Sequence, residues 1–566
     1  MNHVNLILDA KNELHDLVLS ALGRAVADGA LPSEPIPTFV IEIPADTKNG
    51  DFATNVAMVS AKAFKLPPRK IAEIIVEHMI LKGTNFEKIE IAGPGFINIF
   101  LNKNWFSNVI REVEINNENY GRTNFGENKK VMVEFVSANP TGPMHIGNAR
   151  GGAIGDCLAA VLDWAGYDVT REFYVNDAGN QIEKFAISLS RRYLQIYKGE
   201  ENVEFPEDAY QGADIKVLAQ QFADIHGDKY VGVDEQELKE IIVAYALPLN
   251  ITRLKEDLAR YRIDYDVWFF ESTLHENKKV DHIVDLLKEK GLTYELDGAL
   301  FYKASEFGAE KDEVLVRANG IPTYFAADIA YHYNKFADRH FDKVINIWGA
   351  DHHGHVARLK GAMDAVGLDG NKLDVVLMQL VKLMRNGEAV RVSKRTGKSI
   401  TLVDLLDEVP IDAARFFFNL REANSHLDFD LDLAVEQSSQ NPVYYVQYAH
   451  ARICSILLNL KAENISPKSA NECNFDVLTA SEEIELIRHL AIFPNEIVDA
   501  AKSYDPARIT RYSIDLATLF HKFYNACRVK CDNDELMYAR LSLCLAVKTV
   551  LNNVLTLLKI EAPTSM

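Results

Sequence analysis

The sequence predicts a multidomain α/β protein built around a doubly wound parallel sheet. One observation is a buried-strand run at 131–139, followed by a Pro/Gly turn, a long helical stretch and a second strand at 167–177. The same rhythm returns at 343–351 and 374–384. Because strand–helix–strand units form parallel sheets with right-handed crossovers, we expect these segments to share one sheet.

The chain is expected to form three consecutive modules. Residues 1–112 combine an amphipathic helical pattern with short strands about a Gly-Pro-Gly turn, which predicts a compact α+β module. Residues 113–410 predict a Rossmann-like domain, interrupted at about 180–310 by a charge-rich, mostly helical insert. Residues 411–566 are nearly all helical in pattern and predict an all-α bundle.

Composition sets the broad class of protein. The 566 residues suggest about three to five domains, and 48% are hydrophobic, enough for several cores. The six Cys, at 157, 454, 473, 527, 531 and 544, form no CxxC pair, so neither a disulfide framework nor a tetrathiolate zinc site is expected. The chain begins without a basic segment and apolar run, and no stretch of 18 apolar residues occurs. We therefore expect a cytoplasmic protein without membrane contact.

The net charge of −20 opposes a nucleic-acid partner, because polyanion binding depends on Lys and Arg neutralising phosphates. The objection is limited, since binding requires a local basic face and not a basic total.

The first chemical motif lies between the first predicted strand and its helix, where His145-Ile146-Gly147-Asn148 follows a Pro/Gly turn that ends at Pro143. A helix N-terminus offers unpaired N–H groups and a partial positive charge to phosphate. Gly147 lets a base or ribose approach the backbone, and His145 can donate to a phosphoryl oxygen as charge develops. The alternative is a strand-to-helix turn with an incidental His; the strand before and the helix after it favour a nucleotide site.

The run ANPTGPMHIGN (138–148) resembles the "HIGH" signature of class I aminoacyl-tRNA synthetases, and its surroundings (135–156) most resemble the arginyl-tRNA synthetases. Asn148 stands where the family has its second His. The resemblance implies activation of L-arginine with ATP to arginyl-adenylate and pyrophosphate, then transfer to the 3′ end of tRNA(Arg). It also implies that Pro143, His145, Gly147 and Asn148 bind ATP, with His145 catalytic.

The second motif, RVSKRTGK (391–398), is a basic loop. By itself it is equally well a solvated run of charge. Paired with the first motif, it resembles the "KMSKS" loop of class I synthetases, with Arg391 in place of the leading Lys and Val392 in place of Met. The resemblance implies that Val392, Ser393, Lys394 and Arg395 bind ATP and that Lys394 is catalytic.

A guanidinium substrate requires carboxylates and planar acceptors that match its fork. Glu134 lies in an otherwise apolar strand and needs a partner. Tyr324 and Asp328 are four residues apart and share one face of a predicted helix, which a surface pair would also satisfy. Arginyl-tRNA synthetases match both segments, and the resemblance implies that the following residues surround arginine: Glu134, Ser137, Asn139, Tyr324 and Asp328.

The motif WGADHHGH (348–355) gathers His352, His353 and His355. At a strand-to-helix turn these side chains splay, so no metal site is predicted. The resemblance instead implies that Gly349 and Asp351 contact ATP and that His352 lies near arginine or the ribose.

The C-terminal helical pattern contains Tyr448 and Arg452, four residues apart in 441–456. They can stack on splayed anticodon bases, although core packing is the ordinary role of such aromatics. The segment resembles the anticodon-binding domain of arginyl-tRNA synthetases, and residues 1–112 resemble the family's N-terminal domain, which meets the outer corner of tRNA. Tyr448 and Arg452 are therefore the expected tRNA contacts.

The expected mechanism is in-line attack of the amino-acid carboxylate on the α-phosphate of ATP, with catalysis by positioning and charge stabilisation. Mg²⁺ is expected with ATP, held mainly by phosphates and water, and no tightly bound cofactor is expected. We expect a monomer. The resemblance also implies that tRNA must bind before arginine is activated. The alternatives are another class I synthetase, a nucleotidyltransferase with an HxGH turn, and a non-catalytic RNA-binding relative.

Overall fold

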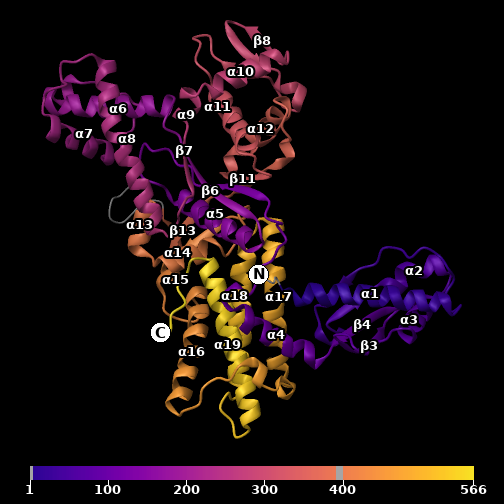
Figure 1. Ribbon diagram of the computed structural model, residues 1–566. Helices are drawn as coiled ribbons and strands as arrows, with labels where there is room; N and C mark the ends of the chain where they lie inside the picture. The colour runs from indigo at the N-terminus through magenta and orange to yellow at the C-terminus, as the bar shows by residue number, and fades with distance from the viewer. Residues whose placement is uncertain (1–3, 391–399) are drawn as a thin grey trace.

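The computed structural model describes residues 4–390 and 400–566 and contains a parallel sheet of strand order β12-β11-β5-β6-β7 (Figure 1). Every neighbouring pair in it is parallel. The strands are β5 (Lys130–Glu134), β6 (Asp168–Val175), β7 (Val267–Phe270), β11 (Lys343–Gly349) and β12 (Leu373–Met378). The chain moves outward from β5 in both directions, so the topological switch point lies beside β5. The predicted doubly wound sheet is confirmed.

Alternating side chains of β5 and β11 divide the core into two layers. Val131 and Val133 belong to the core that contains α5 (Ile146–Trp164), whereas Met132 faces the core of α11 (Tyr324–Tyr333) and α12 (His353–Ala365). This period of two is typical of a strand covered on both faces. Helix α5 packs very closely, because a Cβ on Gly155 would lie 2.2 Å from the Phe135 ring.

The segment expected to be a mostly helical insert, 180–310, has two parts. Three helices form a unit with its own core, seen to one side of the sheet in Figure 1: α6 (Asn180–Lys198), α7 (Ala213–His226) and α8 (Glu235–Arg260). The chain then returns to the central sheet as β7, a run of four residues too short for periodicity to separate strand from helix. The second part contains α9 (Ser272–Glu276), α10 (Lys279–Glu289) and the antiparallel strands β8 (Thr293–Leu296), β9 (Ala299–Tyr302) and β10 (Glu313–Val316).

The run 374–384, which predicts one strand, is broken after Met378. The later part is β13 (Val381–Arg385), which leaves the central sheet to pair with β14 (Glu388–Val390) and β15 (Leu427–Asp430). Arg150 of α5 holds this break: its guanidinium is buried and donates to the carbonyl oxygens of Gln379, Glu422 and Ser425 at 2.7, 3.0 and 2.9 Å.

The N-terminal module projects sideways from the rest of the chain (Figure 1). Its sheet has the order β1-β2-β4-β3. The elements are α1 (Leu6–Ala27), β1 (Ile41–Glu42), β2 (Phe52–Thr54), α2 (Val56–Phe64), α3 (Pro68–Glu77), β3 (Phe86–Ala92) and β4 (Phe96–Leu101). Helix α4 (Lys103–Asn116) then packs against two helices of the C-terminal bundle, α17 (Ser481–Ser503) and α19 (Asp534–Leu557), and so connects the module to the bundle.

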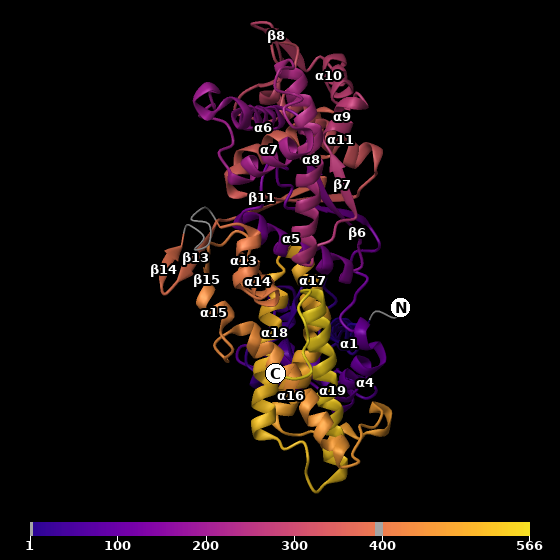
Figure 2. The same ribbon diagram turned by 90° about the vertical axis from the view of Figure 1, so that its left-hand side faces the viewer.

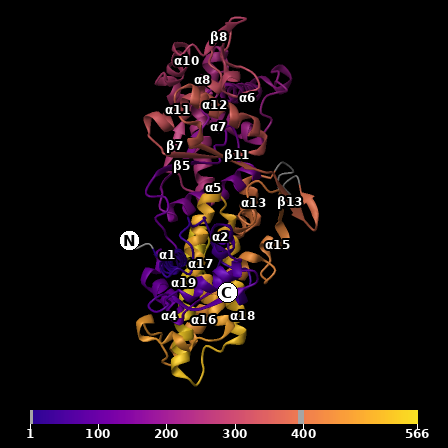
Figure 3. The same cartoon turned by 90° about the vertical axis from the view of Figure 1, so that its right-hand side faces the viewer.

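The predicted C-terminal bundle is present and lies opposite the α6–α8 unit in both side views (Figures 2 and 3). Its helices and the short ones leading to it are α13 (Leu402–Glu408), α14 (Ile411–Phe418), α15 (Leu431–Val435), α16 (Pro442–Ala462), α17 (Ser481–Ser503), α18 (Ala507–Ala526) and α19 (Asp534–Leu557). By length and composition α19 is apolar enough to cross a membrane, and 67% of its most apolar window is buried inside the protein. It packs against α4, α16 and α18.

Candidate active site

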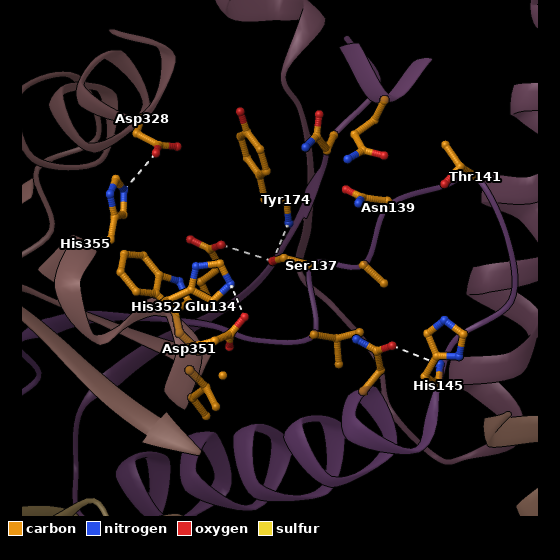
Figure 4. Close-up of a pocket in the computed structure, with 18 of the residues that line it drawn as sticks. Glu134, Ser137, Asn139, Thr141, His145, Tyr174, Asp328, Asp351, His352 and His355 are labelled. Carbon is orange, nitrogen blue, oxygen red and sulfur yellow. Dashed lines mark hydrogen bonds and ion pairs between the residues drawn. The ribbon is translucent and has the colours of Figure 1, made fainter. Parts of the chain in front are cut away.

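A cavity of about 1010 Å³ opens at the carboxyl ends of β5 and β11, where ligands of doubly wound sheets bind (Figure 4). It brings together ten of the predicted site residues: Glu134, Ser137, Asn139, Pro143, His145, Asn148, Asp328, Gly349, Asp351 and His352. Gly147 and Tyr324 are not among its lining residues. Arg391, Val392, Ser393, Lys394 and Arg395 lie outside the described residues.

The first turn of α5 lines the end of the cavity where the sequence predicts that ATP binds. His145 is the N-cap residue, and its backbone N–H donates to Oδ1 of Asn148 at 2.9 Å (Figure 4). The preceding residue, Met144, accepts from the backbone N–H of Leu402 at 2.9 Å, so the chain beyond residue 399 pairs directly with this motif. A Cβ on Gly147 would meet nothing within 4 Å, which leaves the space beside the turn open to a ligand.

The exit of β5 is a strained turn. Val136 and Ser137 have φ values of +67° and +41°, and the Ser137 N–H donates back to the Phe135 carbonyl oxygen at 3.0 Å. A γ-turn centred on a β-branched residue is rare, and each such residue costs on the order of 1–3 kcal/mol. The Tyr265 hydroxyl donates to the Phe135 carbonyl at 3.0 Å, and the Tyr174 N–H donates to Ser137 Oγ at 3.2 Å. These contacts aim the segment that carries Asn139 into the cavity.

Glu134 has a partner that the sequence-based prediction lacks. Its Oε2 lies 2.5 Å from Nζ of the buried Lys335, and its Oε1 accepts from Ser137 Oγ at 3.0 Å. Glu134 still lines the cavity, and its carboxylate is already paired with a cation inside the protein. One signal was available in the sequence: Lys335 follows Asp328 by seven residues, which places both on one helix face.

Two other carboxyl groups lie near the cavity without a Lys or Arg ion pair among the described residues. Asp328 bonds to His355 Nε2 at 2.9 Å (Figure 4). Glu271, at the end of β7, accepts from the Asn176 amide nitrogen at 2.6 Å in the side-chain orientation that suits both. Burial raises the pKa of Glu271 to about 7, and the charge of Asp328 adds to the increase. The sequence-based prediction missed Glu271, because β7 was not recognised as a strand of the central sheet.

The helical unit α6–α8 supplies one wall of the cavity through Gln181, Tyr210, Gly212 and Asp214. No motif in that region predicts this. Tyr324 also meets the unit: its hydroxyl accepts from the backbone N–H of Asn180 at 2.7 Å. Its ring occupies the space that a Cβ on Gly179 would fill, 2.9 Å from the ring edge. Tyr324 therefore packs against the start of α6.

The His-rich turn after β11 adds polar groups and no metal cluster. Asp351 is 83% exposed at its side chain and lies 3.7 Å from His352 Nε2. His353 is exposed, and His355 turns away toward Asp328. Within residues 4–390 and 400–566, no three His, Cys, Asp or Glu side chains are grouped to hold a metal ion.

The predicted tRNA contacts lie far along the chain, on α16. The Arg452 guanidinium lies over the rings of Tyr448 and Tyr524, 4.9 and 4.5 Å from their centres. The Tyr448 ring is stacked with Tyr444 and His521. We call these five residues the aromatic–arginine cluster. Arginine held between aromatic faces is a surface on which unstacked bases can stack.

Comparison with known proteins agrees with this geometry. The family model described as "tRNA synthetases class I (R), catalytic domain" matches residues 110–456. The models for the "Arginyl tRNA synthetase N terminal domain" and the "DALR anticodon binding domain" match residues 12–101 and 446–566.

Full-length relatives extend the match. Proteins named arginine–tRNA ligase from Ruminiclostridium cellulolyticum and Caldanaerobacter subterraneus are 55% and 56% identical, covering 99% of this chain and 100% of each relative. The arginyl-tRNA synthetase structure of Thermus thermophilus has a TM-score of 0.73 at 21% identity, covering 98% of this chain and 100% of that one, a likeness of fold. The chain therefore belongs to the arginyl-tRNA synthetases, a family of class I aminoacyl-tRNA synthetases.

Proposed function

We propose that this chain activates L-arginine with ATP, giving arginyl-adenylate and pyrophosphate, and then esterifies the arginyl group onto the 3′ end of tRNA(Arg). One observation carries the assignment. A single cavity joins the capped N-terminus of α5, which suits phosphate, to the Asp328 carboxylate, which pairs with His355 but with no Lys or Arg among the described residues and so suits a guanidinium.

The arginine end of the cavity is assigned to Asp328, which lines it, and to Glu271, which contacts the lining residue Asn176; neither carboxyl pairs with a Lys or Arg among the described residues. Ser137, Asn139 and His352 supply polar groups around it. Glu134 is matched by Lys335 and is assigned to the framework behind the substrate. Tyr324 borders the site from the helix that carries Asp328 and contacts the start of α6.

The ATP end is assigned to the first turn of α5 and to the exit of β11, through Pro143, His145, Gly147, Asn148, Gly349 and Asp351. The arginine carboxylate attacks the α-phosphorus in line, and the bond to pyrophosphate breaks. His145 and the N–H groups of α5 stabilise the charge that develops on the phosphoryl oxygens. The resemblance of its loop assigns the same role to Lys394, with Val392, Ser393 and Arg395 beside it.

The second step also follows from the cavity's position. The terminal ribose hydroxyl of tRNA attacks the arginyl carbonyl, and AMP leaves. Mg²⁺ enters with ATP and neutralises phosphate charge, for which the exposed Asp351 offers an oxygen ligand at the cavity.

The three modules are assigned separate parts of the reaction. The aromatic–arginine cluster is proposed to bind the anticodon, residues 1–112 to bind the outer part of the tRNA, and residues 113–410 to form the catalytic module. We further propose that the enzyme acts in the cytoplasm as a monomer.

Charging of tRNA with radiolabelled arginine tests the assignment. Wild-type enzyme is expected to charge tRNA with arginine and to reject citrulline, its uncharged isostere. Asp328→Asn should raise the KM for arginine on the order of 10–100-fold, because a hydrogen bond to a charged group is lost. The KM for ATP should stay unchanged.

Asp374→Asn is the matched control. Asp374 lies at the amino end of β12, where it pairs with Lys343, at the opposite edge of the sheet from the cavity. If the control changes the KM for arginine as much as Asp328→Asn does, the assignment of Asp328 fails.

A further inference from the structure

A buried lysine behind the cavity enters the assignments above only as the ion-pair partner of Glu134. Lys335 lies in the π-helical turn Asn334–Asp338 that continues α11, and its side chain has 0% exposed surface. Its ammonium lies 2.5 Å from Glu134 Oε2 and 3.3 Å from Asn346 Oδ1, and 4.0 Å from the centre of the Tyr331 ring. With these contacts and no exposed surface, Lys335 does not face a substrate.

The ion pair reaches the cavity through one carboxylate. The other oxygen of Glu134 accepts from Ser137 Oγ, and Ser137 Oγ accepts from the Tyr174 N–H. Ser137 belongs to the turn in which Val136 and Ser137 both have positive φ. Backbone in such a conformation persists only when its surroundings over-determine it. Without Lys335, the buried Glu134 carboxylate would be unpaired and would take up a proton or move, which weakens its hold on Ser137.

The same ion pair also sets the distance between two parts of the site. Lys335 continues the helix that presents Asp328 to the cavity, whereas Glu134 ends the strand whose exit presents Asn139. Fixing Lys335 to Glu134 therefore fixes the helix that binds the guanidinium relative to the segment that leads to His145. Reacting groups must be held closely, since displacement by about 1 Å can cost on the order of 100-fold in rate.

We propose that Lys335 is a positioning residue for arginine activation, acting through Glu134 and Ser137 to hold the strained turn at residues 135–137. This inference rests on the proposed function. Glu134 then has a positioning role too, because it links Lys335 to Ser137. Because the link is serial, breaking it at either residue, or at both together, should have the same effect.

The test compares Lys335→Met, Glu134→Gln and the double variant in arginine-dependent ATP–pyrophosphate exchange with tRNA present. Each single variant should lower kcat on the order of 10–100-fold with the KM for ATP unchanged. The double variant, which buries no unpaired charge, should be no slower than the slower single variant. Melting temperatures are measured in parallel, and the double variant decides the question if a single variant does not fold.

Arg339→Met is the matched control. It breaks the neighbouring ion pair between the partly exposed Arg339 and the buried Glu172, whose nitrogen and oxygen are 2.5 Å apart, and removes no side-chain contact of the strained turn. It should lower the melting temperature and leave kcat close to that of the wild type.

A rescue separates positioning from stability. Glycine adopts positive φ without strain, so Val136→Gly in the Lys335→Met background should recover part of the lost kcat. Additive losses in the double variant, a wild-type kcat in any variant of the pair, or an equal kcat loss in Arg339→Met would overturn the inference. A wild-type enzyme without arginine-dependent exchange would instead overturn the proposed function, and the inference with it.

Discussion

Asn148 Oδ1 accepts a hydrogen bond from the backbone N–H of His145 at 2.9 Å, so the residue that replaces the second His of the signature closes the first turn of α5. The bond fixes the N-cap residue at the point where the helix presents free N–H groups to the cavity. The amide side chain accepts this hydrogen bond without adding a charge to the site. Asn148 thus shapes the phosphate end of the site through the backbone that carries His145.

Substitutions at Asn148 separate its capping role from its charge. Asn148→Ala removes the hydrogen bond to the His145 N–H and should lower the free energy of unfolding by about 1 kcal/mol. It should also lower kcat for arginine-dependent ATP–pyrophosphate exchange. Asn148→Asp keeps the acceptor, and so the melting temperature, but should raise the KM for ATP because a carboxylate repels phosphate. Thermal melts and ATP titrations check both. Equal melting temperatures for the Ala and wild-type proteins would contradict the capping role.

Glu271 predicts a pH dependence of arginine binding. Burial raises its pKa to about 7, with Asp328 adding to the increase, and the groups around it are Tyr174, Asp177 and His275. A guanidinium binds the ionised carboxyl, so below pH 7 binding must release a proton. The KM for arginine should therefore rise as the pH falls below about 7 and level off above it.

Glu271→Gln distinguishes this carboxyl from histidines that titrate in the same range. The variant should have a higher KM for arginine at pH 8 and a flat pH profile between 6 and 8. An unchanged slope in Glu271→Gln would assign the titration to another group.

We expect the stability of the fold to be especially sensitive to loss of the Asp156 charge. Its carboxylate is fully buried and accepts from Arg415 at 2.6 Å and from Lys559 at 2.9 Å, which joins α5 to α14 and to the end of α19. Asp156→Asn removes the carboxylate that faces Arg415, Lys559 and, at 3.6 Å, Arg171, and should cost about 3–5 kcal/mol of unfolding free energy. Denaturant unfolding measures it.

Asp163→Asn provides the comparison for Asp156. Asp163 lies on the same helix and pairs with Arg122, with 47% of its side chain exposed. The identical substitution there should cost less than about 1 kcal/mol. Similar losses at both positions would mean that burial of the ion cluster is not what makes Asp156 important.

Arg452 tests the anticodon assignment of the aromatic–arginine cluster. Arg452→Ala should raise the KM for tRNA about 10-fold and make binding less dependent on salt, because stacking and a cationic contact are lost. At saturating tRNA, kcat should match the wild type. Lys461→Ala, an exposed cation at the last turn of the same helix, is the control. A change in kcat without a change in KM for tRNA would make the cluster a packing feature.

The strand–turn–helix from β5 to α5 could be predicted from sequence because its signals are local. A buried run, a Pro/Gly turn and a polar N-terminal turn lie within 35 residues, and they place Asn139, His145 and Asn148 at one cavity. The bundle could be predicted for the same reason, since each helix carries its own apolar periodicity.

The interior of the site could not be predicted in the same way, because its partners meet over long distances. Lys335 pairs with Glu134 across 201 positions, and Glu271 enters the site only because β7 joins β6. The break after Met378 depends on Arg150, a residue of a distant helix. The polar motifs indicate which residues approach substrate; the contacts that fix them depend on the tertiary fold.

ATP–pyrophosphate exchange with each of the twenty amino acids, run with and without bulk tRNA, tests the central claim most directly. We predict exchange with arginine alone, and only when tRNA is present. Exchange with arginine in the absence of tRNA would keep the enzyme assignment and remove the ordering of the two substrates. Exchange with another amino acid, or with none under either condition, would contradict the claim that Asp328 and Glu271 select arginine for activation.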